Sequence, residues 1–533
     1  MLEFKREPGS DIKLQEQNYK AINDDYVKFY RLALEYANRT SNSIVSFITP
    51  HGFLDNPTFR GMRWRLLDFF SSIYVIDLHG DSRRKETCPD GSKDENVFDI
   101  QQGVCIFIGI KRANEKTSSV YRYDLYGLRT LKYDWLNTKS FSTIEWNLVD
   151  TQEPYYFFEN RDTSYYDEYN EGFSIKDLFV EDVMGIATAR DSIVIDSNYD
   201  VLKERFERLA NPSISDDILA EELYGTNTKK ANLSNVQKGW SLTEARKKIY
   251  NKDISQYIHP ISYRPLDNRF IFYHPYWVDR DRSEIMKHFL SGDNLGLCLI
   301  RISRDDVFAT VVTDNLTDKT ILSSKDNANV FPLYLYDDNG INRRRANYNH
   351  EVIREIENRL GLTFDEEKSV DTNNTFSSVD LLDYIYAILF SNKYREKYRA
   401  VLKSDYPRIP YPATIGLFKR LVGLGRELRN LHLLKTEDCF ARSWFFYGEG
   451  NNVIESIKYC DEKIYINRVQ YFSNISEKLW IAYIAGYQPL QKWLKDRKGH
   501  ILTEVDISHY IHMIAVIEKT ISVIQDIDSI IEL

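Results

Sequence analysis

The chain has 533 residues, 43% of them hydrophobic, and a formal net charge of −9 at neutral pH. A chain of this length can bury several cores, so two to four domains are expected, and its acidic balance at first sight disfavours nucleic acid as a partner. No apolar run approaches the ~18 residues of a membrane span, and the start MLEFKREPGSD lacks a secretory hydrophobic segment, so we expect a cytoplasmic protein. The absence of a CxxC pair argues against a zinc site and against a disulfide framework. The five cysteines are Cys88, Cys105, Cys298, Cys439 and Cys460.

Helical and strand-like patterns alternate over the first 112 residues. Residues 25–37 place apolar side chains at helical spacing, and residues 59–70 also predict a helix. Short runs rich in β-branched and aromatic residues predict strands at 44–48, 73–78 and 104–110. The alternation predicts a partial α/β layer.

The rest of the chain changes character twice. Residues 113–341 are rich in Tyr, Asp and Asn, with short strand-like runs, and end at a turn signal in 337–340. Beyond a linker at 342–350 the pattern becomes helical, with Ser377 and Ser378 able to cap a helix. The predicted domains are therefore 1–112, 113–341 and a mainly helical 342–533.

Residues 78–112 combine a charged, Gly-containing loop with a buried strand, and Phe98 lies on that loop just before the strand. An aromatic ring in this position could be presented to a flat substrate. The segment resembles the back half of the catalytic domain of N6-adenine DNA methyltransferases, especially those fused into type ISP restriction–modification enzymes.

The resemblance extends over almost the whole chain and rests on the order and spacing of weak elements. Residues 43–55, 59–70 and 73–78 look like the elements that follow the catalytic tetrapeptide of that family. Five further segments resemble elements of the family's target-recognition region: 185–191, 263–269, 380–386, 406–412 and 428–434. The implied fold is α/β plus α+β: a partial Rossmann-like methyltransferase layer, a mixed target-recognition region and a helical C-terminal part of the specificity domain.

Two motifs of that family are not found. It binds S-adenosylmethionine with a Gly-rich loop and positions the adenine amino group with Asn-Pro-Pro-Tyr, whereas residues 273–276 and 408–411 lack the Pro-Pro core. Gly423-Leu424-Gly425 lies in a helical, basic segment with no strand before it. The chain looks like a methyltransferase that begins just after its tetrapeptide. We therefore expect it not to bind the cofactor alone, and an upstream methyltransferase or helicase–nuclease polypeptide is a candidate partner.

By resemblance, Phe98 aligns with an aromatic residue that stacks on the adenine after it is flipped out of the duplex. Such a base loses its neighbours, and an aromatic face restores roughly 1–3 kcal/mol. The alternative is a core phenylalanine beside a strand. Thr49, Pro50 and His51 are expected to line the same site, with His51 as a polar lining residue and not a general base.

Double-stranded DNA is the expected partner because the positive charge is concentrated. Residues 393–435 hold 11 Lys/Arg against 3 acids, which is typical of a phosphate-tracking surface, although ordinary solvated helix charges are the alternative. Among the amides, Asn268, Asn294 and Asn315 could read adenine. The predicted DNA-binding arginines are Arg264, Arg269, Arg280, Arg282, Arg301, Arg304, Arg395, Arg399, Arg426 and Arg429.

Arg264, Asp267 and Arg269 have a competing interpretation as a structural ion-pair network, which we prefer for that short motif. Two functions stay open. The chain is either the specificity portion of an adenine-specific DNA methyltransferase, inactive alone, or a truncated DNA-binding remnant without catalysis.

Overall fold

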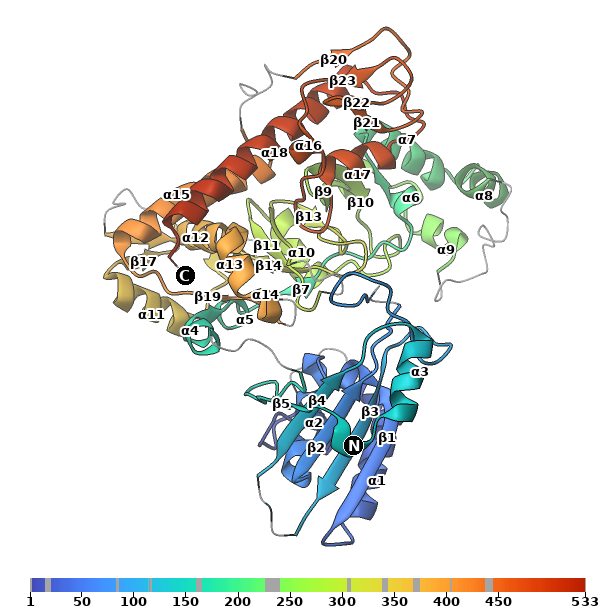
Figure 1. Ribbon diagram of the computed structural model, residues 1–533. Helices are drawn as coiled ribbons and strands as arrows, with labels where there is room; N and C mark the ends of the chain where they lie inside the picture. The colour runs from blue at the N-terminus through green and yellow to red at the C-terminus, as the bar shows by residue number, and fades with distance from the viewer. Residues whose placement is uncertain are drawn as a thin grey trace. The chain divides into compact units, whose positions relative to one another are not determined.

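The computed structural model describes residues 2–14, 21–82, 86–113, 115, 117–159, 165–225, 240–303, 308–337, 344–367, 374–402, 405–436 and 444–532. The chain divides into two compact units, Met1–Ser164 (unit 1) and Tyr165–Leu533 (unit 2), each with its own core (Figure 1).

Unit 1 is built on one mixed five-stranded sheet of order β1-β3-β2-β4-β5. The strand β3 pairs antiparallel with both β1 and β2, whereas β2 and β4 are parallel, so β1, β2 and β4 all run in the same direction. Their carboxyl ends therefore lie at one edge of the sheet. The strands are β1 (Ser43–Pro50), β2 (Ser72–Asp77), β3 (Val104–Lys111), β4 (Ser119–Asp124) and β5 (Asn147–Val149).

The helices α1 (Asp25–Ala37) and α2 (Arg60–Phe69) share a core with Phe107 on β3. A second small core joins α3 (Arg129–Thr138) to the ends of β2 and β4. The strands and helices predicted in the first 112 residues are confirmed. The predicted boundary at residue 112 falls within this sheet, which continues through β4 and β5.

The first half of unit 2 contains two small four-stranded sheets of order β13-β9-β10-β8 and β12-β11-β14-β7. In the hairpin β9–β10 the turn is only Pro265-Leu266, and Leu266 takes a positive φ of 62°. The strands are β7 (Val183–Met184), β8 (Ile195–Asp196), β9 (Ile258–Arg264), β10 (Asp267–Phe272), β11 (Gly296–Leu299), β12 (Thr310–Thr313), β13 (Leu316–Thr317) and β14 (Asn329–Pro332). The accompanying helices are α4 (Tyr166–Glu171), α5 (Ile175–Leu178), α6 (Asp191–Val194), α7 (Tyr199–Ala210), α8 (Asp216–Tyr224), α9 (Leu242–Lys247) and α10 (Ser283–Leu290).

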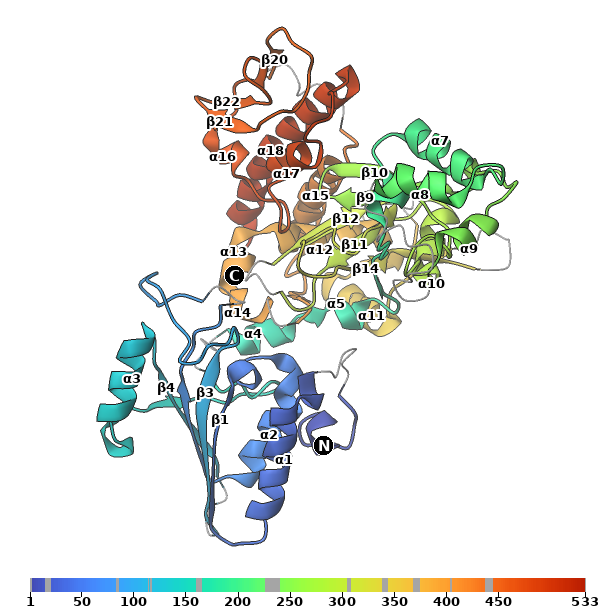
Figure 2. The same ribbon diagram turned by 90° about the vertical axis from the view of Figure 1, so that its right-hand side faces the viewer.

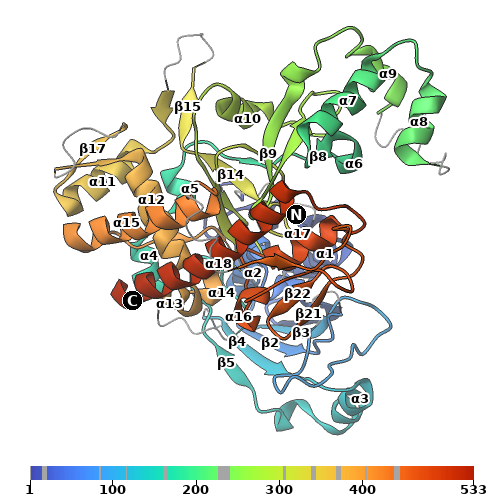
Figure 3. The same cartoon turned by 90° about the horizontal axis from the view of Figure 1, so that it is seen from above.

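Three long helices form the helical part of unit 2: α12 (Ser378–Phe390), α15 (Ile415–His432) and α18 (Glu504–Ile530). They lie side by side in Figure 3 and pack against one another. A capping box of Ser377 and Asp380 starts α12, as predicted from the serines. A Cβ at Gly425 would lie 1.8 Å from the Asp383 carbonyl oxygen, so this glycine of α15 permits close approach to α12.

The helix α18 resembles a membrane span in length and composition, although Glu518 and Lys519 interrupt its apolar run. Among the described residues it is the one helix long and apolar enough to cross a membrane by length and composition. Its buried residues, including Met513, Ile514 and Ile517, belong to the core of unit 2, as expected of a core helix.

The region 342–533 is less helical than predicted. It contains a four-stranded sheet, β20-β23-β22-β21, which Figure 2 shows beside α16 and α18. Its strands are β20 (Phe446–Tyr447), β21 (Lys458–Cys460), β22 (Lys463–Tyr465) and β23 (Tyr471–Phe472). The remaining strands of unit 2 form two-stranded pairs: β6 (Phe173–Ser174) with β19 (Arg408–Ile409), β15 (Tyr334–Tyr336) with β16 (Arg344–Ala346), and β17 (Thr363–Asp365) with β18 (Thr375–Ser377). The remaining helices are α11 (His350–Leu360), α13 (Asn392–Lys397), α14 (Arg399–Leu402), α16 (Glu477–Trp480) and α17 (Pro489–Asp496).

Candidate functional sites

The carboxyl edge of the unit 1 sheet gathers the chemistry-bearing side chains of that unit. Ligands of open α/β sheets bind outside the carboxyl ends of the strands. Here β1 ends in Thr49 and Pro50, followed by His51, while β2 and β4 end in Asp77 and Asp124. The structure thus places the three predicted lining residues at one strand end, beside two carboxylates that the sequence analysis did not nominate.

A buried ion-pair network fills this edge. Asp77 accepts hydrogen bonds from His51 Nδ1 at 2.9 Å and from Arg122 Nη2 at 2.8 Å. His79 follows β2, and its Nδ1 lies 2.6 Å from Glu86 and its Nε2 2.8 Å from Asp124. Both ring nitrogens of His79 face carboxylate oxygens, which only accept hydrogen bonds, so these contacts favour the doubly protonated imidazolium.

The network also holds a proton on His51. Burial by itself lowers the pKa of His51, but the hydrogen bond to Asp77 and the nearby Asp81 carboxylate raise it to about 10. Burial likewise opposes the charge on His79, whereas Asp124 and Glu86 raise its pKa to about 9. A base protonated up to about pH 10 does not accept a proton at neutral pH. The geometry therefore makes His51 a fixed cation of the site.

His51, Asp77 and His79 bring potential metal-ligand atoms within 4.8 Å of one another. Asp77 pairs with His51 and Arg122, and both ring nitrogens of His79 face carboxylates, so each of the three groups already has a protein partner. These contacts make the cluster an ion-pair network.

Phe98 lies on the loop that leads into β3 at the same edge, and its side chain is 43% exposed. The backbone around it is fixed. Asn96 accepts from the Phe98 amide at 2.9 Å and donates to the Gln102 carbonyl, while Arg129 on α3 donates to the carbonyls of Asn96 and Phe98. An exposed ring on an anchored loop suits a stacking surface, and the alternative of a core phenylalanine is contradicted.

Two glycines beside the network, Gly80 and Gly103, are required by close packing of the chain on itself. Gly80, with φ of 80°, would place a Cβ 2.4 Å from the Cα of Asn96, and a Cβ on Gly103 would meet the His51 ring at 2.4 Å. Both glycines nearest the network therefore permit packing of the protein on itself.

In unit 2 the first two predicted arginines belong to internal ion pairs. Arg264 bonds Asp318 at 2.9 Å, and Arg269 bonds Asp267 at 2.7 Å. Arg497 bonds the same Asp267 at 2.8 Å, and these arginines hold the pKa of that carboxyl, despite its burial, at about 2. The preferred interpretation as a structural ion-pair network is confirmed for Asp267 and Arg269, whereas Arg264 pairs with Asp318 instead.

The other arginines of this segment differ in exposure. Arg280 is 54% exposed, with Asp279 at 3.8 Å. Arg282 is 21% exposed, and its φ is 57° at the start of α10. Arg301 bonds Asp405 at 2.9 Å. Arg304 lies outside the described residues.

The basic segment 393–435 is an open surface only in part: Lys393, Lys419 and Arg420 are exposed, whereas other cations of the segment form internal ion pairs. Arg429 bonds both oxygens of Asp383, at 2.6 and 3.0 Å, and Arg426 bonds Asp380 at 3.0 Å. These carboxylates lie on α12, so the two arginines join α15 to α12.

Arg395 also has an internal role: it donates to the Leu389 carbonyl at 2.6 Å over the Phe390 ring, and burial lowers its pKa to about 10. Arg395 and Arg429 are thus engaged inside unit 2, whereas Arg426 keeps a 41%-exposed side chain beside its ion pair with Asp380. Arg399 is exposed at the start of α14.

The three predicted amides also differ in burial and in their hydrogen-bond partners. Asn294 is buried and bridges the His288 and Tyr334 carbonyls at 3.0 and 2.8 Å, so its role is structural. Asn315 donates to Asp314 at 2.8 Å. Asn268 is exposed on β10.

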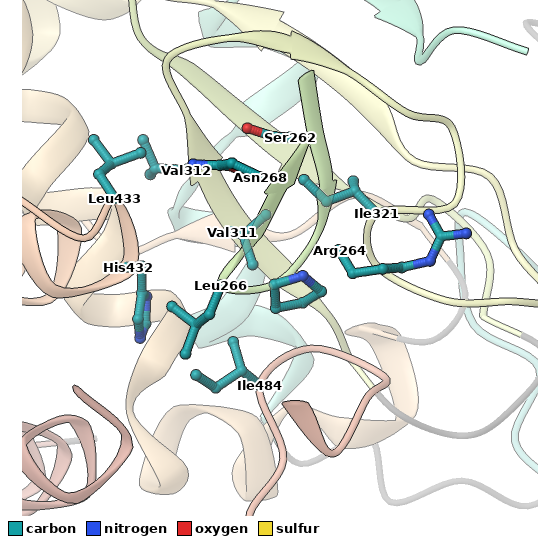
Figure 4. Close-up of a pocket in the computed structure, with 11 residues that line it drawn as sticks. Ser262, Arg264, Leu266, Asn268, Val311, Val312, Ile321, His432, Leu433 and Ile484 are labelled. Carbon is teal, nitrogen blue, oxygen red and sulfur yellow. The ribbon is translucent and has the colours of Figure 1, made fainter. Parts of the chain in front are cut away.

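Asn268 borders a small hollow between the β9–β10 turn and the end of α15 (Figure 4). The other lining side chains include Val312, Leu433 and Ile484, which are apolar. His432 also lines it and is held by Tyr386 Oη at 2.5 Å, with burial lowering its pKa to about 3. The hollow therefore combines apolar side chains with polar groups: the exposed Asn268 amide, the Ser262 hydroxyl and the side chain of Arg264, which is paired with Asp318.

Comparison with known proteins identifies the larger unit. The family model of the Type ISP C-terminal specificity domain matches residues 177–526, which is more than half of the chain. A search of curated proteins gave no match.

Three solved structures share the fold over 96% of this chain. They are the ATP-dependent Type ISP restriction–modification enzyme LlaBIII bound to DNA (TM-score 0.70, 22% identity), a nuclease-deletion mutant of the Type ISP enzyme LlaGI in complex with a DNA substrate mimic (0.66, 18%) and a DrdV–DNA complex (0.67, 19%). The chain covers 34%, 41% and 53% of their respective lengths, so it corresponds to part of such proteins. Through residues 177–526, this chain belongs to the Type ISP C-terminal specificity domain family.

Proposed function

We propose that this chain is the DNA target-recognition part of a restriction–modification enzyme and binds double-stranded DNA sequence-specifically. The observation that carries the proposal is the family match over residues 177–526, supported by three structures of the same fold in complex with DNA or a DNA substrate mimic. A specificity domain serves to distinguish one sequence from another, which requires contacts to base edges in addition to phosphates.

Among the predicted arginines, Arg280 and Arg399 fit phosphate contact best because both side chains are exposed. The internal pairs of Arg264, Arg269 and Arg429 remove those side chains from consideration, since breaking such a pair leaves a buried charge without a partner. In this proposal the acidic net charge is no obstacle, because only the contacting surface must be basic.

Salt-dependent binding tests the proposal. The full chain should bind a duplex oligonucleotide in fluorescence anisotropy, with log affinity falling linearly against log salt. Arg280→Gln and Arg399→Gln should each reduce the magnitude of that slope by about 0.9 if the side chain neutralises one phosphate. Arg208→Gln is the matched control, because Arg208 is 47% exposed but paired with Glu222. Absence of duplex binding at low salt would refute the proposal.

We further propose that unit 1 belongs to an S-adenosylmethionine-dependent adenine-N6 methyltransferase in which Phe98 stacks on the extruded base. The exposed, anchored ring and its place at the carboxyl edge support this assignment. The cofactor loop and the tetrapeptide would come from a polypeptide outside these residues, with Thr49 and Pro50 lining the base site. A second candidate is a chain that binds DNA without methyl transfer, which is favoured because neither the Gly-rich loop nor Asn-Pro-Pro-Tyr is found among these residues.

A further inference from the structure

The sheet β20–β23 in unit 2 has two chemically different faces, which its register defines. Tyr447 pairs with Tyr471, and Tyr471 with Tyr465. Lys458 on β21 lies opposite Tyr465. One continuous row therefore crosses all four strands as Tyr447, Tyr471, Tyr465 and Lys458, and paired residues of a sheet point to the same side.

The opposite face is the packed one. Phe446 pairs with Phe472, and Phe472 with Ile464. The ring of Phe472 lies 4.5 Å from that of Tyr510 on α18, so this face is fixed to the long helix. The tyrosine row consequently faces away from the core.

The outer row is a surface of hydrogen-bond donors. Its neighbouring rings are 5.7 and 5.1 Å apart, and Lys463, two residues before Tyr465 on β22, holds its ammonium 4.9 Å from the Tyr471 ring centre. The Tyr447 side chain is 47% exposed, and Lys458 is exposed. No ion pair joins Lys458 or Lys463 to another described residue, and Asp461 and Glu462 lie in the turn at the end of this face.

We infer that this face, formed by Tyr447, Tyr465, Tyr471, Lys458 and Lys463, contacts the phosphate backbone of duplex DNA; the inference rests on the proposed function. Phenol hydroxyls and ammonium groups are common donors to phosphate oxygens. The strand positions of this face carry two positive charges and no acidic residue. Such a face is complementary in charge to a polyanion. A protein partner is a weaker match because lysine is depleted in protein interfaces, although tyrosine is enriched there.

Two sets of substitutions separate the charges from the hydroxyls without removing the packed rings. Lys458→Gln with Lys463→Gln should lower the magnitude of the log–log salt slope by up to about 1.8, since each neutralised phosphate contributes about 0.9. Tyr447→Phe, Tyr465→Phe and Tyr471→Phe together should weaken binding roughly tenfold for duplexes of any sequence and leave the slope unchanged, because no charge is lost.

A matched control lies on α1 and the turn that follows it, where Arg39 stacks over the 58%-exposed ring of Tyr36. Tyr36→Phe with Arg39→Gln should bind DNA like the parent, since this pair lies before β1, at the sheet edge opposite the strands' carboxyl ends. Anisotropy over a salt series with two unrelated duplexes measures all variants, and light scattering records self-association.

The outcomes are distinguishable. If the parent binds duplex DNA and both variant sets match it in affinity and slope, the inference alone is overturned. Loss of a parent dimer in those variants with unchanged DNA binding would assign the face to a second copy of the chain and also overturn it. If the parent does not bind duplex DNA, the proposed function fails and the inference fails with it.

Discussion

Phe98 illustrates how a single ring can be exposed and yet well positioned. Its side chain contributes little to either core, while Asn96 and Arg129 fix its backbone through four hydrogen bonds around the loop. Binding sites work best when the contacting group is held in place before the ligand arrives, because less entropy is lost on binding. The sequence indicated the ring and its loop, but the Arg129 anchor, 31 residues away, is visible only in the structure.

Phe98→Ala should therefore leave stability nearly unchanged. Exposed positions usually change the free energy of unfolding by within about 0.5 kcal/mol, whereas truncating a core phenylalanine costs about 3–5 kcal/mol. Duplex affinity should also be kept, since phosphate contacts dominate it. Urea unfolding and anisotropy measure the two quantities.

A second readout tests the stacking role itself. When an upstream fragment with the cofactor loop and tetrapeptide is co-expressed, Phe98→Ala should reduce 2-aminopurine fluorescence at the target base and lower methylation. Phe98→Trp should retain more of both because it keeps an aromatic face. A parallel fall of stability and DNA affinity in Phe98→Ala would contradict the stacking role.

At the scale of elements, α12 and α15 show why charge counts along a sequence mislead. Residues 393–435 carry a large basic excess, but the carboxylates that neutralise Arg426 and Arg429 lie 46 residues earlier, on α12. No local pattern reveals that Asp383 is buried and faces α15. Hydrophobic periodicity, by contrast, acts within one element, and it correctly predicted α1, β1, α2, β2 and β3.

The network at the carboxyl edge was missed for a related reason. His51 was nominated, but His79, Arg122 and Asp124 come from other strand ends and meet it only once the sheet is assembled. A signal was present in the sequence: an aspartate and a histidine, Asp77 and His79, directly end an apolar strand. Polar residues at successive strand ends of an α/β layer indicate a shared edge.

Arg429→Ala should destabilise unit 2 strongly. The substitution leaves the fully buried Asp383 carboxylate without its bidentate partner, and breaking a buried pair in this way costs about 3–5 kcal/mol. Arg429→Met with Asp383→Leu should recover much of the loss, because the double variant leaves no buried charge. Urea unfolding followed by circular dichroism measures this, with Arg399→Met as the exposed control. A stable Arg429→Ala protein with weakened DNA binding would contradict the structural role and show that Arg429 contacts phosphate.

At the scale of the whole molecule, the two units have separate cores, so their stabilities can respond differently to pH. The pKa values of the buried histidines are shifted in opposite directions in the two units. His51 and His79 in unit 1 have pKa values raised to about 10 and 9, while His432 in unit 2 has its pKa lowered to about 3. A neutral His432 gives no pH dependence above its unfolded pKa of about 6.5.

Alkaline pH should therefore destabilise unit 1 selectively. For a group whose folded pKa is raised, the stabilisation is fully present below the unfolded pKa of about 6.5 and is lost as the pH rises through the folded pKa, here about 9 to 10. The loss should be several kcal/mol, since each unit of pKa separation corresponds to about 1.4 kcal/mol. Hydrogen exchange at pH 6.5 and 9, corrected for the intrinsic rate and read on peptides from β1–β3 and from α12 and α15, measures each unit separately. His51→Gln with His79→Gln should be less stable at pH 6.5 and should flatten the response of unit 1. Two outcomes would show that the imidazolium network does not control the stability of the sheet edge. One is an equal loss of stability in both units at alkaline pH, and the other is an unchanged pH response of unit 1 in the double variant.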